Sequence, residues 1–520
     1  MARHNSTHLY DLISSLSKNE KRYFKMQAAV SGNPEDKKMM RLFDEINRSP
    51  EKYNEKLIVQ KVTGLKIQQV SNMKAYLYTK ILQSIRQYNA PRILDIQIRE
   101  QIDYAQLLFE RRLYLQGLNC LRKARKLASI HDNPELQLEI IKLEKSVLMN
   151  TIDQDTETKV DQLIFSVKHL LKKINNIALF SNLSIKLNSF YTRTGYIKDE
   201  EDFIQVKRFF EENLTVPQGN EELSETELMH LYRLYIGYYF FIQDFKNGFS
   251  YAEKLVALFQ QSPELCKGNI EGYIKVLNNL LIAQYKLYKF EEFTETNKLL
   301  QSIGEENKSH INQSTRIRLK KYYYMHEINR YFMTGEFSLG IQTLLKGNEE
   351  VVGLIDSLDH NSALILSYKI ACLYFGAGEF HQSLKWLNRI INTPHDELRE
   401  DIHSFSRIIH LICHYEIGNN DVIRYYVIST YRFILKKKDL HDFQKYILSF
   451  LKELTVEMEE GQLIDKFKKL KLNLLPLADN AYEKRAFIYF DIISWLEGKI
   501  EKKSVEEIIR TKAKLRLKIN

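Results

Sequence analysis

The chain has 520 residues, of which only 8 are proline and 19 are glycine, while 44% are hydrophobic and 12% are aromatic. This length is several times that of a typical domain, and so few turn-forming residues exclude a protein rich in β-strands, so we expect an all-α protein with a sizeable core. The net charge of +10 is uneven, because residues 1–95 carry +8 and residues 499–520 carry +5, which leaves −3 for residues 96–498.

Residues 1–95 form a basic helical region at the N-terminus. Ser17 and Glu20 have the spacing of a capping box, which predicts a helix start. Further along, residues 53–88 predict a helix, a turn at Gly64 and a long second helix. The second helix is indicated by apolar residues that recur at helical spacing: Val70, Met73, Leu77, Ile81, Ile85 and Tyr88.

The segment 53–88 is compatible with a DNA-binding helix-turn-helix, with Gly64 in the turn and Val70 buried in the second helix. Polar side chains able to contact base edges and phosphates would then face outward, namely Lys66, Gln68, Gln69, Ser71, Asn72 and Lys74. Two helices joined at a glycine are also typical of a helical cap or a module that docks a partner protein. The sequence leaves both interpretations open, and DNA stays a candidate partner of this region.

A repeat follows in residues 96–498. Four stretches share an aromatic-rich helix end, a short turn, a phenylalanine and a second amphipathic helix, and their phenylalanines are Phe245, Phe290, Phe337 and Phe380, at spacings of 45, 47 and 43 residues. Gly335 and Gly378 each lie two residues before their phenylalanine, where a tight turn between antiparallel helices needs a residue that tolerates positive φ. The repeating unit is therefore a helical hairpin.

The same register extends with weaker matches in both directions. Glycines mark the turns that we expect at Gly195, Gly418, Gly461 and Gly498, and Tyr114, Gly117, Leu121 and Ala124 mark a further unit. Two helix starts are predicted from capping signals, Asn133 before Pro134 and the capping box of Ser224 and Glu227. Together these matches predict about nine or ten hairpins.

The hairpin pattern resembles the tetratricopeptide repeat (TPR). In the unit at 364–397 the matching residues are Ala371, Tyr374, Gly378, Phe380, Ser383, Leu387 and Ile390. The period of 40–47 residues differs from the usual period of about 34, and the tryptophan of the first helix is missing. The resemblance implies a right-handed α–α superhelix over residues 96–498, with residues 499–520 as a basic capping helix or tail. Two stretches near the N-terminus, SLSKNEKRYFK and AYLYTKILQSIRQY, are also similar to helical proteins of Bacteroidota, which implies no activity.

The resemblance also implies a function, since stacked TPR hairpins bind extended peptides or helices in a concave groove lined by the first helix of each unit. By register, the groove-facing residues would be Arg233, Phe240, Asn278, Tyr285, Tyr322, Asn329, Phe332, Tyr368 and Phe375. Aromatic and arginine side chains are favoured contact residues, although the same rings are equally compatible with a core role. We therefore expect a non-catalytic protein–protein interaction scaffold or adaptor with a protein or peptide partner.

Residues that could carry chemistry are sparse. His410 and His414 share a helix face beside Cys413, but no further ligand has zinc-site spacing, and Leu411 stands where a zincin has its catalytic glutamate. We interpret both histidines as structural and expect no enzyme activity, metal, cofactor or small-molecule substrate. The acidic run at 199–202 is interpreted as the N-terminal cap of the helix that follows.

The four cysteines are far apart in the sequence and form no CxxC motif. The N-terminus has no apolar run typical of a signal peptide. The apolar stretch at 234–242 has about half the length that a membrane span needs. These features predict a soluble cytoplasmic protein without a membrane partner, and the similarity to helical proteins of Bacteroidota implies that it is bacterial. The alternative function is a transcriptional regulator in which residues 53–88 bind DNA and the TPR-like region is a sensor.

Overall fold

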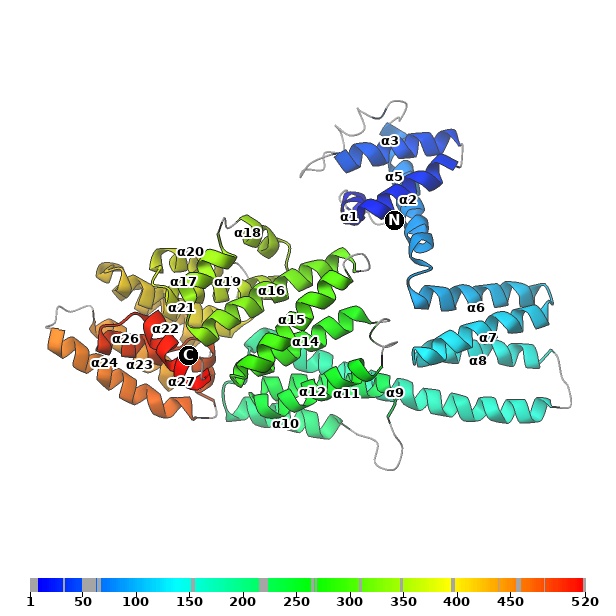
Figure 1. Cartoon of the computed structure of the whole chain (residues 1–520). Coiled ribbons are helices and arrows are strands. Elements are labelled where there is room, and N and C mark those ends of the chain that lie inside the picture. Colours follow the sequence, from blue (N-terminus) through cyan, green and yellow to red (C-terminus); the bar gives the residue numbers. More distant parts are fainter. Residues whose placement is uncertain are drawn as a thin grey trace. The chain divides into compact units, whose positions relative to one another are not determined.

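The structure is a computed structural model that describes residues 8–30, 33–48, 62, 67–150, 155–214, 223–262, 266, 269–307, 311–346, 349–393, 398–437, 439–454, 460–480 and 482–517. Across these residues all regular secondary structure is helical (Figure 1). The all-α class predicted from composition is therefore confirmed. Contacts divide the chain into two units, Met1–Ile174 and Asn175–Asn520.

Within the described residues, the first unit begins with four helices that pack around one core. They are α1 (His8–Ser15), α2 (Lys18–Val30), α3 (Pro34–Arg48) and α5 (Val70–Asn89), the last preceded by the 3₁₀ turn η1 (Ile67–Gln69). Phe24 and Phe43 pack ring to ring in this core, at 4.9 Å between centroids, beside the buried Leu77 and Ile81 of α5. The predicted apolar stripe of α5 is thus confirmed, whereas Gly64 and most of the first predicted helix lie outside the described residues.

The remainder of the first unit continues as antiparallel helices. They are α6 (Leu94–Glu110), α7 (Tyr114–Ile130), α8 (Pro134–Leu148) and the first half of α9 (Thr156–Thr194). Asn133 caps α8 by accepting a hydrogen bond from the backbone N–H of Leu136, with Pro134 at the first helical position, as predicted.

The second unit packs as consecutive helix pairs (Figure 1). After the end of α9 its helices are α10 (Glu200–Asn213), α11 (Glu225–Phe241), α12 (Phe245–Gln261), α14 (Ile270–Lys286), α15 (Phe290–Glu306), α16 (Gln313–Thr334), α17 (Phe337–Leu344), α18 (Glu349–Asp356), α19 (His360–Gly376), α20 (Phe380–Ile391), α21 (Glu400–Glu416), α22 (Asn420–Lys436), α23 (Asp442–Glu453), α24 (Glu460–Leu474), η2 (Leu475–Ala478), α25 (Arg485–Tyr489), α26 (Ile492–Glu501) and α27 (Val505–Leu517). All four phenylalanines of the predicted repeat begin the second helix of a hairpin, which confirms the register. The capping box of Ser224 and Glu227 at the start of α11 is also present.

The hairpins share one turn geometry. A residue with positive φ lies two positions before the first residue of the next helix. The residue that directly follows it donates its backbone N–H to the carbonyl oxygen five positions earlier in the chain. Asp244, for example, donates to Tyr239 at 2.8 Å. Among the described residues this left-handed position is held by Arg112, Asp132, Gln243, Tyr288, Gly335, Gly378 and Gly418. Two glycines that were predicted to lie in turns lie in helices instead, Gly461 in α24 and Gly498 in α26. After α26 it is Lys502 that takes the left-handed conformation.

Aromatic rings join the two helices of a hairpin across its turn. The last turn of the first helix contributes one ring and the start of the second helix contributes the other, at centroid distances of 5.3–5.9 Å. The pairs are Phe240 with Phe245, Phe332 with Phe337, and Phe375 with Phe380. Each pair covers the turn with apolar surface and fixes the angle at which the helices meet.

The N-terminal part of the second unit contacts a segment that comes much later in the chain. The backbone N–H of Arg399 donates to the carbonyl of Thr192 at 2.9 Å, and the Arg399 guanidinium lies over the ring of Tyr191. The same guanidinium donates hydrogen bonds of 2.9 and 2.7 Å to the carboxylate of Asp401, and both side chains are almost fully buried. The hairpins between these segments therefore form a stack whose two ends are tied together.

The turn geometry predicts how substitution by alanine affects stability at two glycines. At both of them the position of an added Cβ has open space around it. Gly418 has a φ of 77°, whereas Gly353 is an ordinary residue within α18. We expect Gly418→Ala to destabilise the protein by about 1–2 kcal/mol, because a left-handed alanine is strained. Gly353→Ala should be neutral or stabilise by up to about 1 kcal/mol through helix propensity. Thermal unfolding of both variants measures the difference, and equal shifts would contradict the turn assignment.

Candidate functional site

The second unit contains an open pocket of about 620 Å³, which we call the chamber. Its walls come from the first helices of three consecutive hairpins, α14, α16 and α19, and from the C-terminal segment. Seven of the nine predicted groove residues line it: Asn278, Tyr285, Tyr322, Asn329, Phe332, Tyr368 and Phe375. Residues at equivalent positions of stacked helices face the same side, which brings these side chains together.

The other two predicted groove residues, Arg233 and Phe240, belong to α11 and lie outside the chamber lining. Phe240 packs against Phe245 and so closely over Gly248 that an added Cβ on this glycine would lie 2.6 Å from the ring. Burial lowers the pKa of Arg233. In the structure Phe240 thus packs within its own hairpin.

The C-terminal segment forms one wall of the chamber. The ring of Phe490 meets Phe375 edge-on, with centroids 4.8 Å apart, and α27 packs against α16. An added Cβ on Gly335 would lie 2.5 Å from the backbone nitrogen of Arg510, so this turn also needs glycine because α27 approaches it closely. Sequence reasoning did not place this segment beside the hairpins, and the apolar run FIYFDII at 487–493 is the local signal that a buried stretch follows α24.

A chain of hydrogen bonds joins three helices at the chamber wall, and three of its four residues line the chamber. Lys369 Nζ donates to Asn329 Oδ1 at 2.6 Å, Asn329 Nδ2 lies 3.5 Å from His326 Nδ1, and His326 Nε2 lies 2.9 Å from Asn278 Oδ1. This order makes Nδ1 an acceptor and leaves the imidazole proton on Nε2. Burial and the nearby charge of Lys369 lower the pKa of His326 to about 3, so the ring is neutral at physiological pH. The two amides, which sequence reasoning assigned to ligand contact, orient side chains from α16 and α19.

Lysines that sequence reasoning missed also line the chamber. Lys286 and Lys369 directly follow Tyr285 and Tyr368 in the sequence, and Lys321 directly precedes Tyr322. Burial lowers the pKa of Lys369 to about 8, and burial together with the charge of Lys369 holds the pKa of Lys286 well below its usual value. Lys321 Nζ donates to Ser362 Oγ at 3.0 Å, and burial lowers its pKa as well. The adjacent lysine and tyrosine on three successive hairpins are a pattern that could have been found in the sequence.

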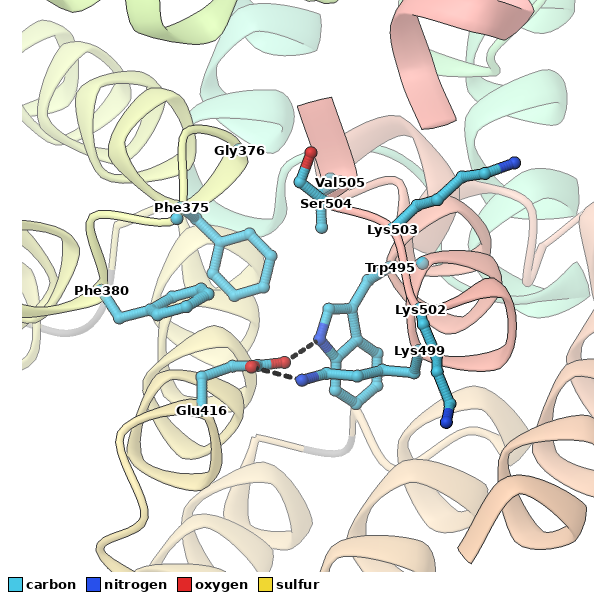
Figure 2. A pocket seen from close by; sticks show the side chains of 12 residues that line it. Phe375, Gly376, Phe380, Glu416, Trp495, Lys499, Lys502, Lys503, Ser504 and Val505 are labelled. Carbon is cyan, nitrogen blue, oxygen red and sulfur yellow. Dashed lines mark hydrogen bonds and ion pairs between the residues drawn. The ribbon is translucent and has the colours of Figure 1, made fainter. Parts of the chain in front are cut away.

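A smaller pocket of about 410 Å³ lies between the turn of the α19–α20 hairpin and the α26–α27 hairpin. Figure 2 shows Glu416 at its base, where the carboxylate accepts hydrogen bonds from Trp495 Nε1 and Lys499 Nζ, each at 2.5 Å. Both carboxylate oxygens of Glu416 are therefore occupied by groups of the C-terminal segment. Phe375, Gly376 and Val505 border this pocket and the chamber alike.

The remaining candidate residues lie elsewhere. Of the predicted DNA-contacting residues in the first unit, Gln68, Gln69 and Asn72 are exposed and Lys74 is half-buried, whereas Lys66 lies outside the described residues. In the second unit, the rings of His410 and His414 meet edge to face with a centroid distance of 4.5 Å, and His410 Nε2 lies 3.1 Å from Asn388 Oδ1. Burial, followed by the nearby His414 and Arg407, lowers the pKa of His410 to about 4.

Comparison with models of known protein families gives no match, and comparison with curated proteins gives none either. Within the described part of the chain, no helix combines the length and the apolar character that crossing a bilayer requires.

The depressed pKa of Lys369 predicts a pH-dependent stability. The ammonium group of Lys369 has a pKa near 10.5 in the unfolded chain and about 8 in the folded chain. Below pH 8 the buried charge therefore lowers the free energy of unfolding, and this loss of stability disappears as the pH rises from about 8 to 10.5. We expect Lys369→Met to raise the melting temperature relative to wild type at pH 7, with a smaller gain at pH 10. Lys298→Met, at an exposed position on α15, is the matched control. A gain that does not change with pH would contradict the assignment.

Proposed function

We propose that the chain is a non-catalytic interaction scaffold, built as a right-handed superhelix of TPR-like hairpins, that binds a peptide or helix of a partner protein. The observation that carries this proposal is the convergence of seven predicted groove residues from three consecutive hairpins on one chamber. The chamber volume fits a few partner side chains and not a whole helix. The partner would therefore lie on the concave surface and insert its anchor side chains.

Aromatic rings are the chemical basis of this binding. Tyr322, Phe332 and Tyr368 are available from the chamber walls, and large rings provide contact area at low cost in side-chain entropy. Tyr322 and Tyr368 are 8% and 5% exposed, so each ring has most of its surface in the protein and only one edge toward the chamber. A ligand would meet rings that are already held in place, which lowers the ordering cost of binding.

Affinity capture from the native lysate tests the scaffold proposal with variants that keep apolar volume. We expect Tyr322→Leu/Phe332→Leu to lose partner proteins that the wild type retains, with a drop of at least about tenfold, because removal of a central aromatic contact costs about 2 kcal/mol or more. Tyr323→Leu is the control, since Tyr323 is the neighbour of Tyr322 on α16 and is 38% exposed. Equal recovery by wild type and both variants would show that the chamber rings do not bind the partner.

A second candidate function is transcriptional regulation, in which the first unit binds DNA and the TPR-like region is a sensor. The observation that favours it is the exposure of Gln68, Gln69 and Asn72 together around the start of α5, in a region whose net charge is +8. Amide side chains can pair with adenine edges, and the surrounding lysines and arginines can contact phosphates.

Measurement of duplex DNA binding by the full chain at several salt concentrations tests this second function. We expect a dissociation constant that rises steeply with salt, because phosphate contacts release counterions, and Gln69→Ala/Asn72→Ala should weaken sequence preference more than overall affinity. Absence of any electrophoretic retardation at low salt would rule the function out.

A further inference from the structure

Two lysines of the chamber have no carboxylate partner. Among the described residues, no ion pair joins an acidic side chain to Lys286 or Lys369. Their side-chain nitrogens lie 5.1 and 5.4 Å from the centroid of the same ring, Tyr285, so both lysines adjoin one ring of the chamber lining. Lys286 Nζ donates a hydrogen bond to the carbonyl oxygen of Ile488, at a long 3.5 Å.

The acidic side chains around the chamber form hydrogen bonds or ion pairs with groups other than Lys286 and Lys369. Asp491 is the one carboxylate among the described lining residues, and its two oxygens accept hydrogen bonds from the backbone N–H and hydroxyl of Ser494, at 3.0 and 2.6 Å, which cap α26. Lys512 pairs with Glu497 at 2.5 Å. The lining thus contains two lysines, Lys286 and Lys369, that form no ion pair with its single described carboxylate.

Buried ammonium groups are unfavourable unless an opposite charge accompanies them. Lys369 is nevertheless held in place by its hydrogen bond to Asn329, which is itself fixed through His326, so the structure keeps this charge directed at the chamber. A polar network that holds one lysine without an acidic partner, beside a second lysine, is what a site for an anion requires.

The rest of the chamber has the character of a small-molecule site. Phe332 adjoins the ammonium group of Lys369, 5.6 Å from its centroid, and Tyr368 lines the same space. The volume of about 620 Å³ lies within the range of pockets that enclose a whole small organic ligand. At the exposed rim, the Arg516 guanidinium lies 4.1 Å over the ring of Tyr288, where it would attract an incoming anion.

We propose that the chamber binds a small aromatic compound with one anionic group, a phosphate or a carboxylate. The anion lies between the ammonium groups of Lys286 and Lys369, and the aromatic body packs against Tyr285, Phe332 and Tyr368. This site does not depend on the proposed scaffold function, because the ligand is a free small molecule and not a partner protein. Both occupants would use Phe332 and Tyr368, so they would compete for the chamber.

Titration calorimetry of the full chain with three probes of similar size tests this proposal: phenyl phosphate, phenylacetate and uncharged 2-phenylethanol. We expect at least one of the two anions to bind about tenfold or more tightly than 2-phenylethanol, and the tighter anion identifies the group that the lysines prefer. Lys286→Met/Lys369→Met should lose at least about tenfold in affinity for that anion.

Two controls keep the outcome unambiguous. The double variant removes buried charges, so its melting temperature should not fall below that of wild type, which separates lost binding from lost folding. Lys298→Met/Lys320→Met removes two lysines from exposed positions and should bind the anion as wild type does. The proposal is overturned if neither anion binds, if 2-phenylethanol binds as tightly as both anions, or if the chamber variant retains wild-type affinity.

Discussion

One backbone conformation organises most of the hairpins in this protein: a single left-handed residue that lies two positions before the next helix. The fixed interval starts each second helix at the same angle, and the aromatic pair across the turn holds that angle. Because successive hairpins are similar, the inward faces of α14, α16 and α19 come into alignment. The chamber exists only because of that alignment, so its side chains depend on turns that lie away from it.

The sequence predicted these turns where glycine marks them and missed them elsewhere. Gly335 and Gly378 were recognised, but Gln243 and Tyr288 take the same conformation. A non-glycine residue pays a cost there of about 1–2 kcal/mol, which the packing of a hairpin can offset, so residue type does not report the geometry. The phenylalanine two positions later was the more general signal, since Phe245 and Phe290 begin helices without a preceding glycine.

The candidate site was predicted in part for similar reasons. Helical register alone placed the aromatic residues of three hairpins on one side, because register is a local property. The adjacent lysines were missed, since Lys286 and Lys369 look like ordinary surface positions until the chamber encloses them. The wall supplied by Phe490 could not be predicted, because no local pattern reports a contact between segments so far apart in sequence.

The shared border of the two cavities has a consequence of its own. Phe375 and Val505 line both the chamber and the Glu416 pocket, so the two spaces adjoin at these side chains. Val505 begins α27, and the salt link of Glu416 to Lys499 fastens the preceding helix. Detachment of this terminal hairpin would remove part of the lining of both pockets, so a molecule that contacts this lining would favour the state in which the hairpin is attached.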